Sequence, residues 1–403
     1  MLALPPAPVV AFAAGPDGTV AVASTIGARV RIVVRAGATR TRSVRSGVGP
    51  VSDLFAATDE RGATTVVWDA PSLGGRLRMR AMTVDRRNRV LASASAVPLR
   101  AEMRPVALIA GRGRALLVVN VPDILQNGSW CTYQDIGFAG DNYFGAVKTV
   151  RGRFATPTGI GTGDSYAGSA FARDGRALSA DGSGDVGGWP LASGGCTRWR
   201  PVTLAGRRRM RQAVAFAGAA DGSLAWIGQR NAGYYTPTGD EDTPPPQPAP
   251  GLLTGVAIGR GPARTVGFGP RASPGAAALP HGPAAFAWLD EPAPQAFGGR
   301  GRALPARLWA AVLGRSPTLL PGMLDTPEQA SAPQVAAGGD GTVAVLEAAG
   351  RYELATLSRD GTRRATRDLG AVVPENRVSL LSGGPAVDLA RATSKRTTVT
   401  RLR

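Results

Sequence analysis

Histidine and cysteine, which supply many metal ligands and proton-transfer groups in enzymes, are almost absent from this chain of 403 residues. It contains one histidine, His281, and two cysteines, Cys131 and Cys196. A structural zinc site takes about four Cys or His ligands, so none can form, and a hydrolytic triad would depend on His281 alone. Because His281 stands between proline and glycine, we interpret it as a turn residue. We predict no metal site, no cofactor and no catalytic residue.

Long apolar runs are also missing. No segment approaches the roughly 20 apolar residues of a membrane-spanning helix, so we predict no transmembrane segment. The apolar start, MLALPPAPVVAFAAG, lacks the basic residues of a signal peptide and is interpreted as a strand. The pair Cys131 and Cys196 fits a disulfide and export, with two buried thiols as the alternative. We expect an extracytoplasmic monomer (periplasmic, cell-surface or secreted), with the cytoplasm as the alternative location.

Lysine is scarce as well, although the formal net charge is +18. Lys148 and Lys395 are the only lysines, so arginine carries almost all of the positive charge. This balance fits an acidic partner such as a nucleic acid, an acidic glycan or a membrane surface. The arginines are spread over the whole length, however, and the densest run, at 207–211, is too short for a basic arm. We therefore interpret most of them as ordinary surface cations.

Glycine and proline are abundant, with 54 and 32 residues. A turn that ends in glycine and leads into a short apolar run recurs eight times, as in PDGTVAVAS and GDGTVAVLE. The first and last of these glycines are 366 residues apart, which gives a mean period of about 52, near that of a kelch-type propeller blade. The eight glycines are Gly18, Gly62, Gly113, Gly175, Gly222, Gly282, Gly341 and Gly384.

Each copy divides into four short segments with strand character. Residues 333–370 show the division most clearly, as PQVAAG, TVAVLEAA, YELATLSRDG and TRRATRDLG. Continuous apolar runs, such as Leu116 to Val119, predict strands that are covered on both faces. Arginine alternates with apolar residues over 76–81, which predicts a strand with one exposed face.

The last copy contains only three such segments before the chain ends at Arg403. The apolar residues Leu2 to Leu4 precede the first copy and are available as the fourth strand of the last copy. Pairing them with the last strand would close the ring and hide its open sheet edges. We therefore predict an all-β fold in which residues 1–403 form a single β-propeller of about eight four-stranded blades, closed by pairing of the N- and C-terminal strands. A ring of seven blades is the alternative.

The turns GPDGTV and GGDGTV resemble those of the β-propeller superfamily, in particular bacterial TolB-like and kelch-like repeats. The resemblance extends over the whole chain and implies the fold without naming an activity. The Gly-His and Trp-Asp marks of WD40 repeats are absent apart from Trp68-Asp69. Trp68, Trp226 and Trp288 follow the repeat glycine by four to six residues, so we interpret them as side chains that pack between blades.

Long insertions fall between the second and third strands of copies two to six, at 69–75, 121–129, 179–188, 228–251 and 289–305. Insertions gathered on one face of a repeat protein often mark its binding face. They carry aromatic rings and carboxylates, which suit the apolar faces and hydroxyl groups of sugars. The candidate ligand-binding residues are Asn127, Trp130, Asp181, Asp185, Trp189, Tyr234, Tyr235 and Asp242.

Two local patterns in these insertions have alternative interpretations. Ser183, Asp185, Gly187 and Trp189 resemble the Asp-box of sialidase-type propellers, but the spacing is one residue short and the pattern occurs once. The acidic run 240–242 lacks the spaced ligands of a calcium loop and is interpreted as solvated charge.

Three functional hypotheses follow from these features. We favour a non-enzymatic, exported propeller that binds a protein or glycan partner, or acts as a scaffold, through its loop-rich face. The alternative is a sialidase-like, glycan-processing hydrolase or lyase, which would need paired carboxyl groups in the central funnel. The third is binding of a polyanion or nucleic acid, which would need arginines concentrated on one face.

Overall fold

The computed structural model describes residues 1–47, 50–71, 77–99, 103–121, 142–162, 166–172, 175–181, 186–189, 200–201, 212–218, 224–230, 252–258, 264–268, 275–277, 284–290, 307–320, 333–373, 375–382 and 384–402. Within these ranges the chain forms strands and connecting turns, and no helix.

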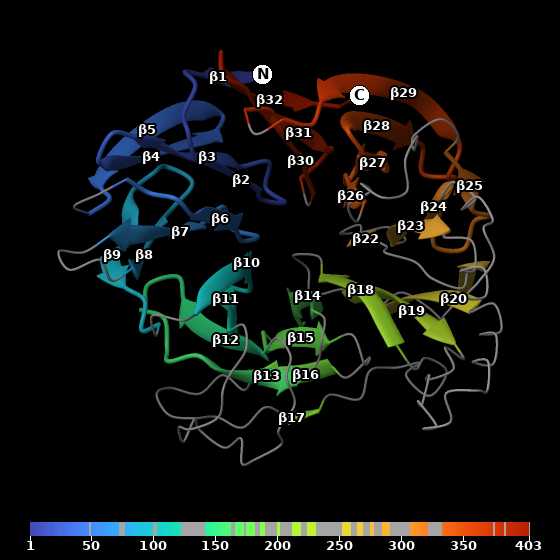
Figure 1. Cartoon of the computed structure of the whole chain (residues 1–403), viewed down its shortest axis with the longest axis horizontal. Helices are drawn as coiled ribbons and strands as arrows, with labels where there is room; N and C mark the ends of the chain where they lie inside the picture. Colours follow the sequence, from blue (N-terminus) through green and yellow to red (C-terminus); the bar gives the residue numbers. More distant parts are fainter. Residues whose placement is uncertain are drawn as a thin grey trace, which may run out of the picture.

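The described strands form eight four-stranded antiparallel sheets that stand around a common axis, which is the architecture of a β-propeller (Figure 1). We call each sheet a blade and number the blades along the chain. In blades 1 to 7 the strands follow one another outward from the axis in sequence order. In blade 8 the outermost strand is β1, from the N-terminus.

Blades 1 to 4 contain the first half of the strands. Blade 1 holds β2 (Val10–Ala14), β3 (Val20–Ile26), β4 (Arg29–Ala36) and β5 (Ala38–Arg45). Blade 2 holds β6 (Leu54–Thr58), β7 (Thr64–Pro71), β8 (Leu77–Val84) and β9 (Val90–Ala96). Blade 3 holds β10 (Arg104–Gly111), β11 (Arg114–Val121), β12 (Asn142–Thr149) and β13 (Thr158–Thr162). Blade 4 holds β14 (Tyr166–Phe171), β15 (Ala177–Asp181), β16 (Val186–Trp189) and β17 (Arg200–Pro201).

Blades 5 to 8 contain the rest. Blade 5 holds β18 (Gln212–Gly218), β19 (Leu224–Arg230), β20 (Leu252–Ile258) and β21 (Arg264–Phe268). Blade 6 holds β22 (Gly275–Ala277), β23 (Ala285–Asp290), β24 (Arg307–Val312) and β25 (Thr318–Leu319). Blade 7 holds β26 (Gln334–Ala337), β27 (Val343–Ala348), β28 (Arg351–Leu357) and β29 (Arg363–Ala371). Blade 8 holds β30 (Arg377–Leu381), β31 (Asp388–Ala392), β32 (Thr397–Arg401) and β1 (Leu2–Leu4).

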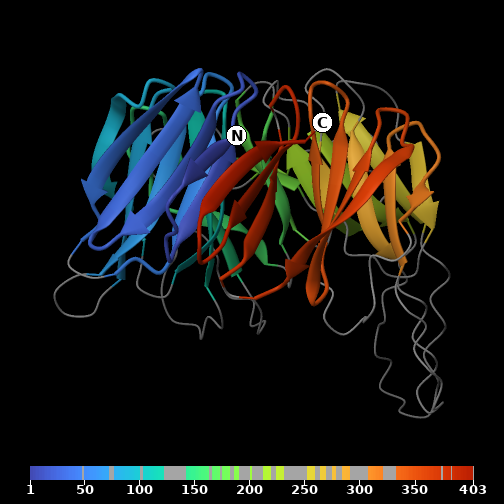
Figure 2. The same cartoon turned by 90° about the horizontal axis from the view of Figure 1, so that it is seen from above.

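The predicted pairing of the two chain ends is present in the structure. Leu2 lies opposite Val399 and Leu4 opposite Thr397, in antiparallel register. The innermost strands of blades 8 and 1, β30 and β2, also contact each other. Figure 2 shows the blue N-terminal blade beside the red C-terminal one. The first strand of the chain thus covers what would otherwise be an open edge of its last sheet.

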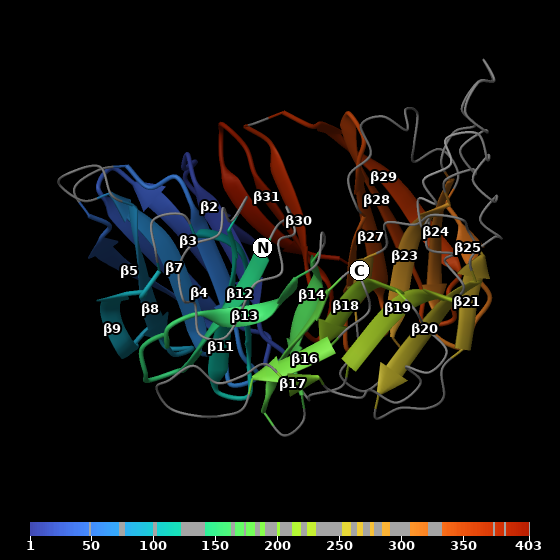
Figure 3. The ribbon, with the colours of Figure 1, turned by 60° about the horizontal axis from the view of Figure 1, so that its bottom comes forward.

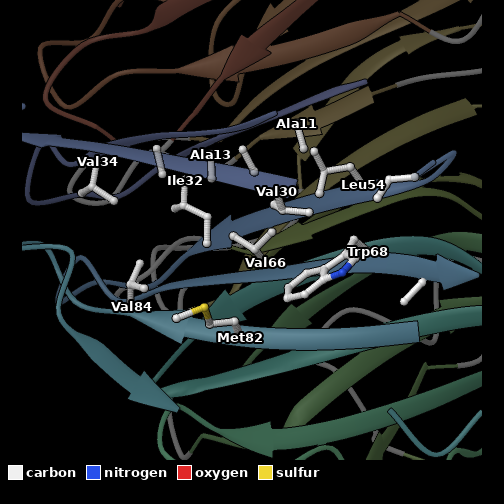
Figure 4. Close-up of a cluster of buried hydrophobic side chains, with 14 residues drawn as sticks. Ala11, Ala13, Val30, Ile32, Val34, Leu54, Val66, Trp68, Met82 and Val84 are labelled. Carbon is white, nitrogen blue, oxygen red and sulfur yellow. The ribbon is translucent and has the colours of Figure 1, made fainter. Parts of the chain in front are cut away.

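Apolar cores lie between neighbouring blades. Between blades 1 and 2, Ile32 and Val34 of β4 pack with Val66 and Trp68 of β7 (Figure 4). The indole N–H of Trp68 donates to the backbone carbonyl of Ser46 at 3.0 Å, so this ring is buried without an unpaired polar atom. Trp68 and Trp288 are both buried, as the sequence predicted for residues that pack between blades.

The second strands of the blades are the most deeply buried. Val20 to Ala23 in β3 and Leu116 to Val119 in β11 have no exposed surface. These strands have a neighbouring strand on each side and a neighbouring blade on each face, so the side chains along their central part are covered; in β3 only the last residue, Ile26, is exposed. Their nearly continuous apolar sequences follow from that position.

The turns between first and second strands are built on aspartate and glycine. The Asp17 carboxylate accepts the backbone N–H of Thr19 at 3.0 Å and its hydroxyl at 2.8 Å. Gly62, at the same position in blade 2, has a φ of 74°, and a Cβ there would lie 2.6 Å from the Asp17 carboxylate. Glycine is required at this turn by its left-handed backbone and by its contact with the turn of blade 1.

The other predicted repeat glycines divide into three groups. Gly18, Gly113, Gly175 and Gly341 share the positive φ of Gly62. Gly384 lies in the corresponding turn of blade 8 but is not in the left-handed region, and its carbonyl accepts the N–H of Gly339 in blade 7 at 3.0 Å. Gly222 and Gly282 lie outside the described residues.

Strands extend further into the predicted insertions than expected. β7 continues to Pro71 and β19 to Arg230, while β15 and β16 together occupy much of 179–188. In each case the strand pairing continues through polar residues, glycine or proline that interrupt the apolar pattern. The connections do lie between the second and third strands, as predicted.

Replacing Leu2 with aspartate tests whether the terminal pairing stabilises the whole ring. The Leu2 side chain is buried against Val33 and Val399, so Leu2→Asp should lower the free energy of unfolding by at least about 2 kcal/mol. Ala3→Asp, on the exposed side of the same strand, is the matched control and should change it by about 0.5 kcal/mol or less. Urea unfolding followed by tryptophan fluorescence measures both. Equal stability of the two variants would show that β1 contributes little.

Candidate functional site

Most of the residues predicted to bind a ligand lie outside the described part of the chain. These are Asn127, Trp130, Asp185, Tyr234, Tyr235 and Asp242, together with Cys131, Cys196, the acidic run 240–242 and His281. Two predicted residues, Asp181 and Trp189, belong to described strands.

The backbone positions of Asp181 and Trp189 are far apart along blade 4. Asp181 ends β15, opposite Tyr166. Trp189 ends β16, opposite Ala177 at the start of β15. The two residues thus lie at opposite ends of the same hairpin, and the structure does not bring them together at one edge of the ring.

The connections between second and third strands nevertheless open on one edge of the ring. Neighbouring strands in each blade run in opposite directions, as the arrowheads in Figure 3 show. All second strands therefore end at the same edge, which we call the insertion edge. The glycine turns between first and second strands lie at the other edge, which we call the turn edge.

The described innermost strands around the axis contain no carboxylate, imidazole, thiol or amine side chain. The sequences of β2, β6, β10, β14, β18, β22, β26 and β30 include no Asp, Glu, His, Cys or Lys. Their charged residues are Arg104 and Arg377, which begin β10 and β30 at the insertion edge and are exposed. The described strands at the axis thus supply no carboxylate pair of the kind a glycosidase needs.

A buried carboxylate instead lies between blades 6 and 7. Glu347 in β27 has no exposed surface and stands directly opposite Glu353 in β28. It follows Val343 and Val345 along the strand face that packs against Leu289 and Leu308 of blade 6. Neither Glu347 oxygen makes a full hydrogen bond with another described residue.

Burial raises the pKa of Glu347 to about 7, and the negative charge of Glu353 contributes to the increase. The backbone N–H of Ala348 favours the charged form and lowers the pKa by more than Glu353 raises it, so burial is the dominant cause. In the sequence, the one sign of this group is a glutamate inside the apolar run TVAVLEAA. The group lies within an apolar core and away from the axis, so the structure gives it no path to a substrate.

Lys148 is a second buried ionisable group, between blades 2 and 3. Its ammonium donates to the hydroxyl of Thr83 in β8 at 2.6 Å and lies 5.6 Å from the centre of the Phe154 ring. Burial lowers its pKa to about 8. Its contacts join two blades, which indicates a structural role.

The single Trp-Asp pair is also structural. The Asp69 carboxylate accepts the backbone N–H groups of Ser52 at 2.8 Å and Asp53 at 3.0 Å. It thereby holds the connection from blade 1 to blade 2 at the insertion edge, beside Trp68. In the sequence, Trp68-Asp69 could be identified only as an isolated WD40 feature, because the residues that donate hydrogen bonds to Asp69 lie 16 and 17 positions away.

The described residues also bear on metal binding and on membrane insertion. No group of three or more His, Cys, Asp or Glu residues in this part of the chain is arranged to hold a metal ion. No helix long and apolar enough to cross a membrane occurs there either. The described residues of the insertion edge include the exposed side chains of Arg104 and Arg377.

No protein-family model matches this chain, and no curated protein matches it in sequence. Similar solved structures include virginiamycin B lyase from Staphylococcus aureus, with 7% identity, a TM-score of 0.42 and coverage of 99% of this chain and 96% of that one. The β-propeller domain of the Trilobed protease from Pyrococcus furiosus has 9% identity, a TM-score of 0.42 and coverage of 99% and 95%. Kuenenia stuttgartiensis hydrazine synthase has 14% identity, a TM-score of 0.48 and coverage of 89% and 99%. These low identities transfer neither an activity nor a ligand to this chain.

Replacing Glu347 with glutamine tests the buried acid through the pH dependence of stability. Because the pKa is raised in the folded state, the native protein holds this proton more tightly than the unfolded chain does. That stabilisation is complete below the ordinary pKa of glutamate, near 4.5, and is lost as the pH rises through about 7. Glu347→Gln should therefore match the wild type near pH 4 and be more stable at pH 8, by up to about 3 kcal/mol.

Unfolding in urea at pH 4, 6 and 8 measures this difference. The exposed Glu375→Gln is the matched control and should follow the wild type throughout. A stability difference for Glu347→Gln that does not change with pH would contradict the raised pKa.

Proposed function

We propose that this protein is a non-enzymatic propeller that binds a protein or glycan partner through its insertion edge. The observation that carries the proposal is a contrast between two parts of the ring, the strands at its axis and the connections at one edge. The described strands at the axis contain no Asp, Glu, His, Cys or Lys, whereas blades 3, 5 and 6 place long second-to-third connections, at 122–141, 231–251 and 291–306, at one edge. A ligand that meets that edge contacts these connections, and binding residues are often found on loops that a rigid scaffold positions.

The glycan-processing alternative receives less support. It needs two carboxyl groups within about 5 to 10 Å of each other at a site that substrate reaches. The described strands at the axis contribute none, and the facing pair Glu347 and Glu353 lies between blades with Glu347 wholly buried. No described feature favours catalysis over binding.

Deleting residues 232–250 from the connection between β19 and β20 tests the role of the insertion edge. Binding of the wild type and the variant to an array of oligosaccharides is the measurement. We expect the variant to unfold at the same temperature as the wild type and to lose binding at least tenfold. The control, Arg86→Ala with Arg87→Ala, changes an exposed turn at the turn edge and should retain binding.

Three results would count against this proposal. Unfolding of the deletion variant would make the segment structural, and retained binding would move the ligand site elsewhere. Release of reducing sugars by the wild type would make the protein an enzyme.

We also propose an extracytoplasmic location. The support is compositional: two cysteines in an otherwise cysteine-free chain fit an oxidised pair. We expect Cys131 and Cys196 to resist alkylation in unfolded protein purified from its native host, and to react after reduction. Mass spectrometry with and without a reductant measures this, and two alkylated thiols without reduction would favour the cytoplasm.

A further inference from the structure

One stretch of the chain combines several arginines with no acidic residue. Between Asp17 and Asp53 the sequence contains six arginines and neither Asp nor Glu. They are Arg29, Arg31, Arg35, Arg40, Arg42 and Arg45. All six lie on β4 and β5, the two outer strands of blade 1 (Figure 1).

Strand register places four of these arginines, Arg29, Arg31, Arg35 and Arg45, on one face, and three of them lie together near Arg29. Arg29 lies directly opposite Arg45, and Arg31 directly opposite Ser43. Opposed residues of an antiparallel pair have Cα atoms about 5 Å apart, and residues two apart along a strand are separated by about 7 Å. We call Arg29, Arg31, Arg45, Ser43 and Thr41 the arginine face.

Arg35, Arg40 and Arg42 differ from these three either in their neighbours or in the face they occupy. Arg42 donates to the backbone carbonyl of Asn88 in blade 2, at 3.1 and 2.9 Å. Arg35 lies close enough to Asp388 of blade 8 to affect the pKa of that carboxyl. Arg40 alternates with Thr41 and so projects from the opposite side of β5.

The charges of the arginine face have no acidic partner among the described residues. Arg29 and Arg45 are exposed, and neither forms an ion pair with any described carboxylate. Arg31 donates through Nε to the hydroxyl of Ser24 at 3.2 Å, and its buried Nη2 has no described acceptor. Like charges placed directly opposite each other destabilise a sheet, so this arrangement disfavours the isolated protein.

Protection of an exposed sheet edge explains only part of this arrangement. Charged residues on an outermost strand prevent pairing with other chains, and β5 is outermost in blade 1. Arg29 and Arg31, however, belong to β4, whose two edges are already paired with β3 and β5. Their charge therefore points to a ligand rather than to edge protection.

The side chains of the arginine face indicate which class of ligand it can bind. Guanidinium groups bind carboxylate and sulfate oxygens through paired hydrogen bonds, and the hydroxyls of Thr41 and Ser43 match sugar hydroxyls. Surfaces that bind single-stranded nucleic acid combine positive charge with aromatic rings on which the bases stack, and no aromatic residue occurs between Phe12 and Phe55. Blade 1 also has only a short turn, at Gly27 and Ala28, where blades 3, 5 and 6 have long connections.

We propose that the arginine face binds a linear polysaccharide that carries carboxylate or sulfate groups. This surface lies on the outer strands of blade 1, so the inference is independent of the ligand proposed for the connections of blades 2 to 6. The polysaccharide chain lies along β4 and β5, with its anionic groups on Arg29, Arg31 and Arg45.

The experiment compares two double variants that have equal net charge. Arg29→Gln with Arg45→Gln removes two charges from the arginine face. Arg363→Gln with Arg364→Gln is the matched control, because both residues are exposed on β29, the outermost strand of blade 7. The probes are a heparin oligosaccharide and polygalacturonate of defined length, with a 20-nucleotide oligothymidylate as comparator, each titrated by fluorescence anisotropy at low and at physiological salt.

We expect the wild type to bind the heparin oligosaccharide or polygalacturonate, and the arginine-face variant to bind about tenfold more weakly, with a smaller dependence on salt. The blade 7 variant should bind within twofold of the wild type. Arg29→Lys with Arg45→Lys keeps the charge but loses the paired hydrogen bonds, so its affinity should be intermediate. Thermal unfolding of the arginine-face variant at or above the wild-type temperature would show that it is folded.

Several results would overturn the proposal. An equal loss of glycan affinity in the arginine-face and blade 7 glutamine variants would show that net charge alone attracts the polymer. Binding of oligothymidylate as tight as that of the glycans, and equally sensitive to the arginine face, would assign the surface to nucleic acid. Failure of the wild type to bind either glycan would leave the face with no ligand of this class.

Discussion

Burial of sheet faces between neighbouring blades is the interaction on which the whole ring depends. No blade can cover its own faces, so each relies on the blade before it and the blade after it. The core of Ile32, Val66 and Trp68 shows the pattern, because its members come from two different sheets. The same dependence makes the pairing of β1 with β32 important, since blade 8 receives its outermost strand from the opposite end of the chain.

This constraint also determines where charge is placed. The second strands have no face toward water, so an ionisable group there pays a desolvation cost, and the raised pKa of Glu347 is the result. Eight innermost strands share the space around the axis, and their sequences are rich in alanine and lack acids. Charge therefore accumulates on the outer strands, where β4 and β5 carry six arginines.

The candidate surfaces differ in how they relate to this scaffold. The insertion edge is where the connections between second and third strands begin and end, and loops of this kind tolerate changes of sequence without disturbing the cores. The arginine face is part of the scaffold itself, because strand register brings Arg29 and Arg45 together. A ligand at the first surface would meet loops, whereas a ligand at the second would meet a preformed sheet.

Features of the fold with local causes could be predicted from the sequence. Aspartate and glycine mark the turns because few other residues satisfy the hydrogen bonds and positive φ found at 17–19. The eight apolar repeats predicted eight sheets, and the three segments of the last repeat predicted the pairing of Leu2 to Leu4. Strand ends were less accurate, because the pairing of β7 continues through Asp69 to Pro71 after the apolar pattern has stopped.

The sequence by itself determined the repeating architecture, since each blade repeats the same short-range pattern of turn and strand. Only the tertiary structure decided which residues meet across blades and across strands. Glu347 is buried because blade 6 covers it, and Asp69 is satisfied by a connection 16 residues earlier in the chain. Arg29 and Arg45 lie side by side because antiparallel register aligns them, which their separation of 16 residues does not reveal.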